Sequence, residues 1–281
     1  MTLDNSIIKI SVNDHGAELK SLIKNNREYM WCGNPEYWGR TSPVLFPFVG
    51  SLKDKKYSTE GKEYSMGQHG FARDMDFRLV EKTDNSLSYE LKSGIDTLEK
   101  YPYNFILTIT YKLTDSELEV IWDVINTDTK PMPFSIGAHP AFNLKSGTNY
   151  FKFDTQKDIT YRLLTSEGLL DKSENHILDN NGYSVIKNSM FDNDALIIEN
   201  NQANEVSLCD ENKNPYITVK FTSPLFGLWS PAGKNAPFVC IEPWYGRCDS
   251  SDFVGDLKDR EYTNILNPQC SFHASYTIYV I

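Results

Sequence analysis

The chain has 281 residues, of which 40% are hydrophobic and 13% aromatic, so it can bury a sizeable core. Its average charged content and its many aromatic residues argue against disorder. The formal net charge of −10 disfavours nucleic acid or an anionic membrane as the main partner, although a local cluster could still bind a small anion.

The beginning of the chain carries an acidic residue, Asp4, and no long apolar run, so neither a signal peptide nor a membrane anchor is expected there. No stretch approaches the roughly 18 consecutive apolar residues of a spanning helix. The five cysteines are scattered and have no C-x-x-C spacing. Reduced thiols and a cytoplasmic location are therefore expected.

Short runs in which apolar and polar residues alternate recur along the chain, as is typical of strands that bury one face. In chain order, strands are expected at 8–12, 87–91, 105–113, 118–124, 196–198, 217–221 and 277–281. The polar segment TDSE joins two of these runs and predicts an antiparallel hairpin. One or two helical turns are expected at 95–101. We therefore predict an all-β fold, a large antiparallel sandwich that forms a single domain over residues 1–281.

Four segments depart from this strand pattern. Proline cannot donate to a sheet ladder, so their X-Pro pairs predict edges, bulges or strand ends, where side chains can be directed into a cavity. Their chemically active side chains are two imidazoles, one carboxylate and two guanidiniums: His69, His139, Glu242, Arg40 and Arg73. The segments are WGRTSPVLFPFVG (38–50), QHGFARD (68–74), IGAHPAF (136–142) and CIEPWYG (240–246).

Taken singly, these residues also have simpler interpretations. A histidine beside a proline, such as His139, is usually a structural hydrogen-bonding group. Glu242 could point outward from an edge strand, because an isolated buried carboxylate is costly. The two arginines would by default form surface ion pairs, and the aromatic residues would by default belong to the core. No ligand spacing recommends His69 and His139 as a metal site, so no metal is expected.

In combination, the segments resemble the aldose 1-epimerase family, the galactose mutarotase-like proteins, over essentially the whole chain. The resemblance is strongest to the bacterial branch associated with lactose and tagatose catabolism. It implies a β-supersandwich and an isomerase that interconverts the α and β anomers of an aldose. It rests on LFPFVG (45–50), HGFAR (69–73), YPYNF (101–105), GAHPAF (137–142) and CIEPW (240–244).

The resemblance also assigns catalytic roles. Glu242 would be the base at the C1 hydroxyl, and His139 would be the acid at the ring oxygen. His69 would hydrogen-bond near the same oxygen. Ring opening and closing need only these proton transfers, so no cofactor is expected.

For substrate binding, the resemblance implies that Arg73 or Arg40 holds sugar hydroxyls or stabilises charge on the open-chain oxygen. Three aromatic side chains would offer flat apolar faces to the sugar: Trp244, Trp38 and Phe142. The chain departs from the family at Ser51, where many relatives carry an arginine, which removes one expected contact. The aspartate that holds hydroxyls in longer relatives is not placed by the sequence, and Asp249 and Asp252 are neighbouring candidates.

Three readings stay open at this point. The first is the anomer-converting isomerase, acting on a free hexose or a hexose 6-phosphate. The second is a non-catalytic sugar-binding protein on the same fold, which the missing arginine at position 51 favours. A glycoside hydrolase or lyase ranks lowest, because hydrolases usually need two carboxylates and the motifs supply one. Pairing of exposed sheet edges would give a homodimer.

Overall fold

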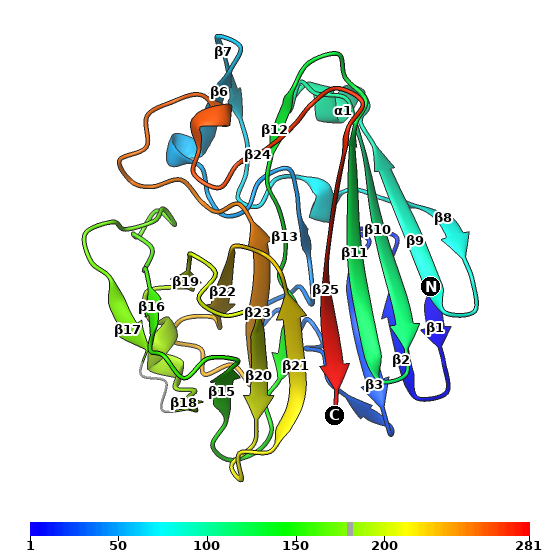
Figure 1. Cartoon of the computed structure of the whole chain (residues 1–281), viewed down its shortest axis with the longest axis vertical. Helices are drawn as coiled ribbons and strands as arrows, with labels where there is room; N and C mark the ends of the chain where they lie inside the picture. Colours follow the sequence, from blue (N-terminus) through cyan, green and yellow to red (C-terminus); the bar gives the residue numbers. More distant parts are fainter. Residues whose placement is uncertain (179–181) are drawn as a thin grey trace.

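The structure is a computed structural model that describes residues 1–178 and 182–281. Its largest sheet curves across the molecule in Figure 1 and pairs all of its neighbouring strands antiparallel. In the described part of the chain, its nine strands follow the order β18 (Ser184–Val185), β15 (Tyr150–Phe153), β20 (Glu205–Cys209), β21 (Pro215–Phe221), β25 (Ser271–Val280), β11 (Glu117–Asn126), β10 (Phe105–Thr114), β9 (Ser86–Lys92) and β8 (Arg78–Lys82).

A second sheet packs against the first through aromatic side chains. Phe226 lies with its ring centroid 5.1 Å from that of Phe221 and 6.4 Å from that of Phe153, both on the large sheet. Apolar side chains thus fill the space between two layers, as in a sandwich. The described strands of this sheet are β19 (Leu196–Ile198), β22 (Leu225–Trp229), β23 (Phe238–Tyr245), β13 (Ile136–Ala138) and β5 (Val44–Leu45), with β14 (Ala141–Asn143) also paired to β23.

Smaller elements complete the described chain. A four-stranded sheet contains β1 (Thr2–Asp4), β2 (Ile8–Val12), β3 (Leu19–Lys24) and β4 (Arg27–Glu28). Three strand pairs are β6 (Lys56–Thr59) with β7 (Lys62–Ser65), β12 (Met132–Phe134) with β24 (Asn264–Leu266), and β16 (Ile159–Tyr161) with β17 (His176–Leu178). The helical turns are α1 (Ile95–Leu98), η1 (Lys53–Lys55), η2 (Ala72–Asp74), η3 (Asn188–Phe191) and η4 (Leu257–Asp259). None of the described helices has the length and apolarity that crossing a bilayer requires.

The predicted hairpin is confirmed in β10 and β11. Every second residue of each strand is buried, because successive side chains point to opposite faces of a sheet and one face meets the core. The register pairs Thr114 with Glu117, so the turn between them is the two residues Asp115 and Ser116. Asp115 has a φ of 50°, a conformation that aspartate tolerates better than most residues. The all-β sandwich is confirmed, and the helix expected at 95–101 is shorter, a single turn.

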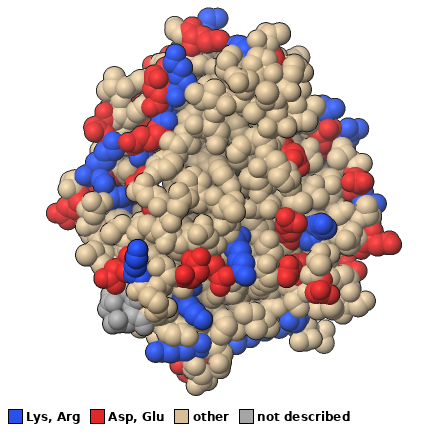
Figure 2. Space-filling model, in the orientation of Figure 1, with Lys and Arg blue, Asp and Glu red and all other residues tan. Residues whose placement is uncertain are grey.

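Charged side chains are mixed on the surface. Figure 2 shows acidic and basic residues interspersed over one face of the molecule, in the orientation of Figure 1. The net charge of −10 is therefore not gathered into a single acidic patch on this face.

Candidate functional site

A cavity of about 160 Å³ lies on the second sheet, on the side of β23 that faces away from the main core. Alternation along β23 separates the two faces, since Ile241 packs into the main core while Glu242 and Trp244 line the cavity. The described lining side chains and backbone come from Trp38, Gly50, Gln68, His69, Arg73, His139, Leu164, Gly168, Asp194, Ala195, Ile197, Trp229, Glu242, Trp244 and Cys248.

Two prolines interrupt the ladder beside β23. β13 ends before His139 and β14 begins after Pro140, while Pro243 lies inside β23, next to the residues that this gap faces. Neither proline has an N–H group to donate to the ladder, so neither adds an unpaired amide donor where the strands separate. Pro140 lies at a strand end, as predicted, but Pro243 lies in the interior of a central strand.

The gap brings the two predicted catalytic residues into contact. His139 Nε2 lies 3.3 Å from Glu242 Oε2, and both side chains are buried. Among residues 1–178 and 182–281, neither oxygen of the Glu242 carboxyl has a hydrogen-bond partner of good geometry. A buried carboxyl group without partners is costly to maintain, which is typical of a group whose partner is a ligand.

Burial sets the protonation of this pair. It raises the pKa of Glu242 well above its ordinary value; the charge of Asp194 adds to this rise and the Trp244 side chain opposes it. Burial also lowers the pKa of His139 to about 3, assisted by the positive charge of Arg73. Burial therefore favours a carboxylic acid beside a neutral imidazole over a carboxylate beside an imidazolium, so the proton that the two groups can exchange is favoured on Glu242.

His69 is held close to this pair by the HGF turn. Its ring centroid lies 5.6 Å from that of His139, and its Nδ1 accepts a hydrogen bond of 3.0 Å from the Gly50 amide. The neutral ring therefore carries its proton on Nε2. Gly70 has a φ of 71°, and a Cβ there would lie 2.3 Å from the Phe46 carbonyl oxygen, so only glycine fits this turn. Burial lowers the pKa of His69 well below its ordinary value.

The two predicted arginines lie in different places. Arg73 lines the cavity and donates a 2.8 Å hydrogen bond to the Gln68 carbonyl. Arg40 is not among the lining residues; it forms an ion pair of 2.6 Å with Asp74 and donates to the Arg73 carbonyl at 3.5 Å. Arg40 thus contacts the segment that carries Arg73.

Three tryptophans form the aromatic wall. Trp38 stacks on His139 with ring centroids 4.7 Å apart, and Trp229 meets the same imidazole edge-on at 5.2 Å. Trp244 fits because its neighbours are glycines: a Cβ on Gly137 would lie 2.6 Å from the indole, and one on Gly227 would lie 2.5 Å from it. The sheet therefore leaves a slot for this ring at both adjacent strands.

Phe142 does not line the cavity. It is fully buried in the main core and pairs with Val239 of β23. Because β14 has only three residues, the alternation pattern could not tell which face of the sheet Phe142 occupies. The aromatic partner that the motifs did not single out is Trp229, which lies on the neighbouring strand β22.

The sequence also missed the carboxylate at the cavity. Asp194 lines it from the turn before β19, with a φ of 70° and its Oδ1 accepting from the Ala195 amide at 2.8 Å. An aspartate in a polar turn carries no sequence signal for such a role. The two candidates named from the sequence lie elsewhere: Asp249 pairs with buried Arg260, and Asp252 lies 3.7 Å from Lys172. Ser51 is likewise absent from the lining.

Comparisons with known proteins agree with this geometry. The family model described as Aldose 1-epimerase matches residues 1–252. The chromosomal protein LacX of Lactococcus lactis subsp. lactis is 30% identical over 295 aligned residues, covering 99% of this chain and 98% of LacX.

Solved structures from lactobacilli share the fold over the full length. A galactose mutarotase related enzyme from Lactobacillus acidophilus has a TM-score of 0.95 and 35% identity, covering 100% of this chain and 97% of that one. A galactose mutarotase-like protein from Lactobacillus casei ATCC 334 has a TM-score of 0.93 and 29% identity, with 100% and 99% coverage. The resemblance predicted from the motifs is confirmed.

Proposed function

Because the chain belongs to the aldose 1-epimerase family, we propose that it interconverts the α and β anomers of an aldose by opening and closing the sugar ring. The observation that carries this proposal is the 3.3 Å contact between His139 Nε2 and Glu242 Oε2 at the wall of a small cavity. Ring opening removes one proton from the C1 hydroxyl and delivers one to the ring oxygen. A carboxyl and an imidazole are sufficient for both transfers.

In the proposed cycle, Glu242 takes the proton of the C1 hydroxyl while His139 protonates the ring oxygen. Sugar hydroxyls that donate to the unpartnered carboxyl oxygens stabilise the carboxylate, so the proton of the pair passes to His139 on binding. Opening returns this proton arrangement to carboxylic acid and neutral imidazole, the state that burial favours. After rotation about C1–C2, the reverse transfers close the ring on the other face of the carbonyl.

Other lining groups supply the remaining sugar contacts in this proposal. His69 Nε2–H donates near the ring oxygen, because its other ring nitrogen already accepts from Gly50. Asp194 accepts from sugar hydroxyls and Arg73 donates to them. Trp38 and Trp244 offer flat faces to the C–H groups of the sugar.

Anomer exchange measured by NMR tests the function directly. A panel of D-galactose, D-glucose and their 6-phosphates is added to the protein, and the exchange rate between the two anomer signals is compared with buffer. At least one aldose is expected to exchange faster. We expect the unphosphorylated sugars to be preferred, because Arg73 is the one Lys or Arg side chain among the described lining residues. Saturable binding without acceleration would instead support a sugar-binding protein.

Phe142 provides a test of which aromatic residues act on the sugar. Phe142→Leu is expected to lower the free energy of unfolding by roughly 1 kcal/mol, because a buried ring is exchanged for a smaller side chain. KM for the sugar should stay unchanged, since Phe142 lies outside the cavity lining. Urea unfolding and saturation kinetics measure the two effects. A raised KM with unchanged stability would instead indicate that Phe142 contacts the sugar.

A further inference from the structure

A third ligating group lies beside the His139–Glu242 pair. Cys240 precedes Glu242 by two residues on β23, so both side chains project from the same face of the strand. One ligand atom from each of His139, Cys240 and Glu242 lies within 4.8 Å of the others, and all three residues are buried. The motif spacing did not reveal this cluster, because His139 comes from the gap between β13 and β14.

The three groups suit a soft divalent cation. Thiolate, imidazole and carboxylate are all zinc ligands, with bond lengths of about 2.0–2.3 Å. A tetrahedral zinc ion would hold its ligand atoms about 3.5 Å apart. His139 Nε2 and Glu242 Oε2 are already 3.3 Å apart, so the cluster closes with a movement of at most about 1.3 Å at Cys240.

The unpaired state of the carboxyl group is a second, independent indication of a ligand. Both carboxyl oxygens of Glu242 lack a hydrogen-bond partner in the part of the chain that the structure describes, although the residue is only 1% exposed. A divalent cation bound by one carboxylate and one thiolate gives a site with no net charge. Such a neutral cluster can be buried at much lower cost than an isolated ion.

We propose that His139, Cys240 and Glu242 form a binding site for Zn²⁺ and related thiophilic divalent cations, with the fourth coordination position open to the cavity. The ion replaces the thiol proton of Cys240 and the carboxyl proton of Glu242, and both protons leave to solvent. If the proposed function holds, the bound ion coordinates both His139 and Glu242, so neither can transfer a proton and anomer exchange is inhibited. The binding itself does not depend on that function.

Cobalt spectroscopy tests the site without any sugar assay. The reduced protein, with exposed Cys32 and Cys270 replaced by serine to remove surface thiols, is titrated with Co²⁺. One equivalent is expected to give a near-ultraviolet thiolate-to-cobalt absorption and tetrahedral visible bands, which Zn²⁺ then displaces. Cys240→Ala should abolish the thiolate absorption. Cys248→Ser is the matched control, since Cys248 is also buried and lines the cavity but does not belong to the cluster.

Two further measurements complete the test. Zn²⁺ should raise the melting temperature of the protein with serine at positions 32 and 270, but not that of the same protein carrying Cys240→Ala. Calorimetric titration should show that Cys240→Ala binds Zn²⁺ at least about tenfold more weakly. Zn²⁺ should inhibit anomer exchange less in Cys240→Ala than in the protein that keeps Cys240, each compared with its own rate without Zn²⁺. The site would be overturned if the protein gave no cobalt absorption. It would also be overturned if the thiolate absorption persisted in Cys240→Ala or was lost in Cys248→Ser. A protein that binds cobalt as expected but exchanges no anomers would contradict only the proposed function.

Discussion

Glu242→Gln is expected to lower kcat/KM for anomer exchange by about 10²–10⁴-fold, which corresponds to about 3–5 kcal/mol of transition-state stabilisation. Glutamine has the same shape but cannot accept the proton of the C1 hydroxyl. The fold should survive, because the carboxyl oxygens make no hydrogen bonds that the amide would lose. His139→Asn should cause a loss of the same order, since it removes the group that we propose as the acid at the ring oxygen.

Anomer-exchange NMR or polarimetry measures the rates, and circular dichroism confirms folding. Glu63→Gln serves as the matched control, because Glu63 is an exposed carboxylate that pairs with Lys56 and does not line the cavity. Full activity in Glu242→Gln would show that this carboxyl is not the base. An unfolded variant would show instead that the carboxyl has a structural role.

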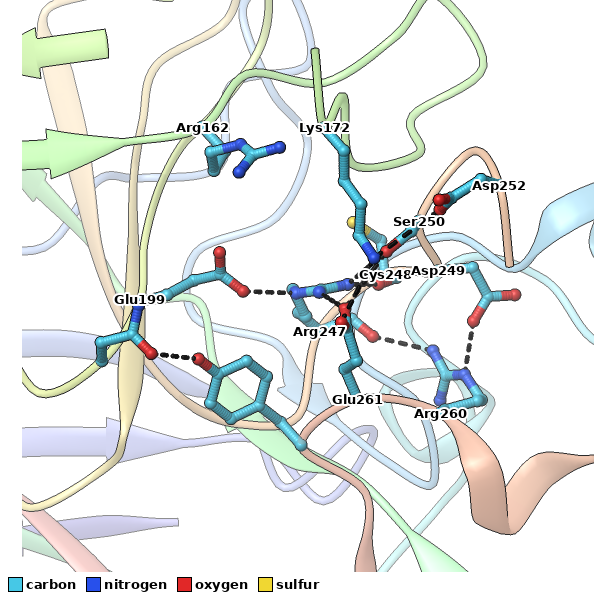
Figure 3. Close-up of polar contacts among 12 residues, drawn as sticks. Arg162, Lys172, Glu199, Arg247, Cys248, Asp249, Ser250, Asp252, Arg260 and Glu261 are labelled. Carbon is cyan, nitrogen blue, oxygen red and sulfur yellow. Dashed lines mark hydrogen bonds and ion pairs between the residues drawn. The ribbon is translucent and has the colours of Figure 1, made fainter. Parts of the chain in front are cut away.

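Asp249→Ala is expected to lower the free energy of unfolding by about 3–5 kcal/mol, because it leaves the Arg260 guanidinium buried without its partner. Arg260 Nε donates to Asp249 Oδ1 at 2.5 Å, and both side chains are only 3% exposed. Figure 3 shows that this pair adjoins Arg247, whose carbonyl accepts from Arg260 at 2.7 Å. Asp249 also accepts from the Lys53 amide at 2.9 Å, so its loss leaves a second donor unpaired.

Urea unfolding measures this effect, and the exposed Lys56–Glu63 pair provides the comparison. Its nitrogen and oxygen lie 2.7 Å apart, but both side chains are at least half exposed, so Glu63→Ala should lower the free energy of unfolding much less than Asp249→Ala does. Equal costs for Asp249→Ala and Glu63→Ala would mean that water reaches Arg260. The comparison also tests the sequence-based suggestion that Asp249 holds sugar hydroxyls, because a stabilising ion pair already occupies its carboxylate.

The sequence predicted the parts of the molecule that depend on local pattern. Alternation located β10 and β11, because a strand that buries one face must repeat every two residues. Prolines located the break in the second sheet, because they cannot donate to its ladder. The sequence predicted that both His139 and Glu242 leave the regular strand pattern. His139 does so, but Glu242 lies inside β23 and pairs with Gly227 of β22. The structure brings the two side chains together across the gap.

Residues whose position depends on the packing of distant segments could not be predicted. Asp194 reaches the cavity because β19 pairs with β22, and the local sequence around Asp194 does not predict that pairing. Phe142 and Arg40 lie within the motif segments, yet Phe142 faces the core and Arg40 pairs with Asp74. Proximity in sequence to a functional residue does not determine the face on which a side chain lies.

The break in the sheet beside β23 has a consequence for the rigidity of the site. His139 and Glu242 stand on backbone anchored on both sides of the break, by β13 and β14 on one edge of β23 and by β22 on the other. The Ile241 amide also donates to the Pro140 carbonyl across the gap, at 3.3 Å. Glu242 thus lies on a central strand, and His139 lies in a short connection held by a strand at each end, so the proposed base and acid are preorganised before any sugar binds.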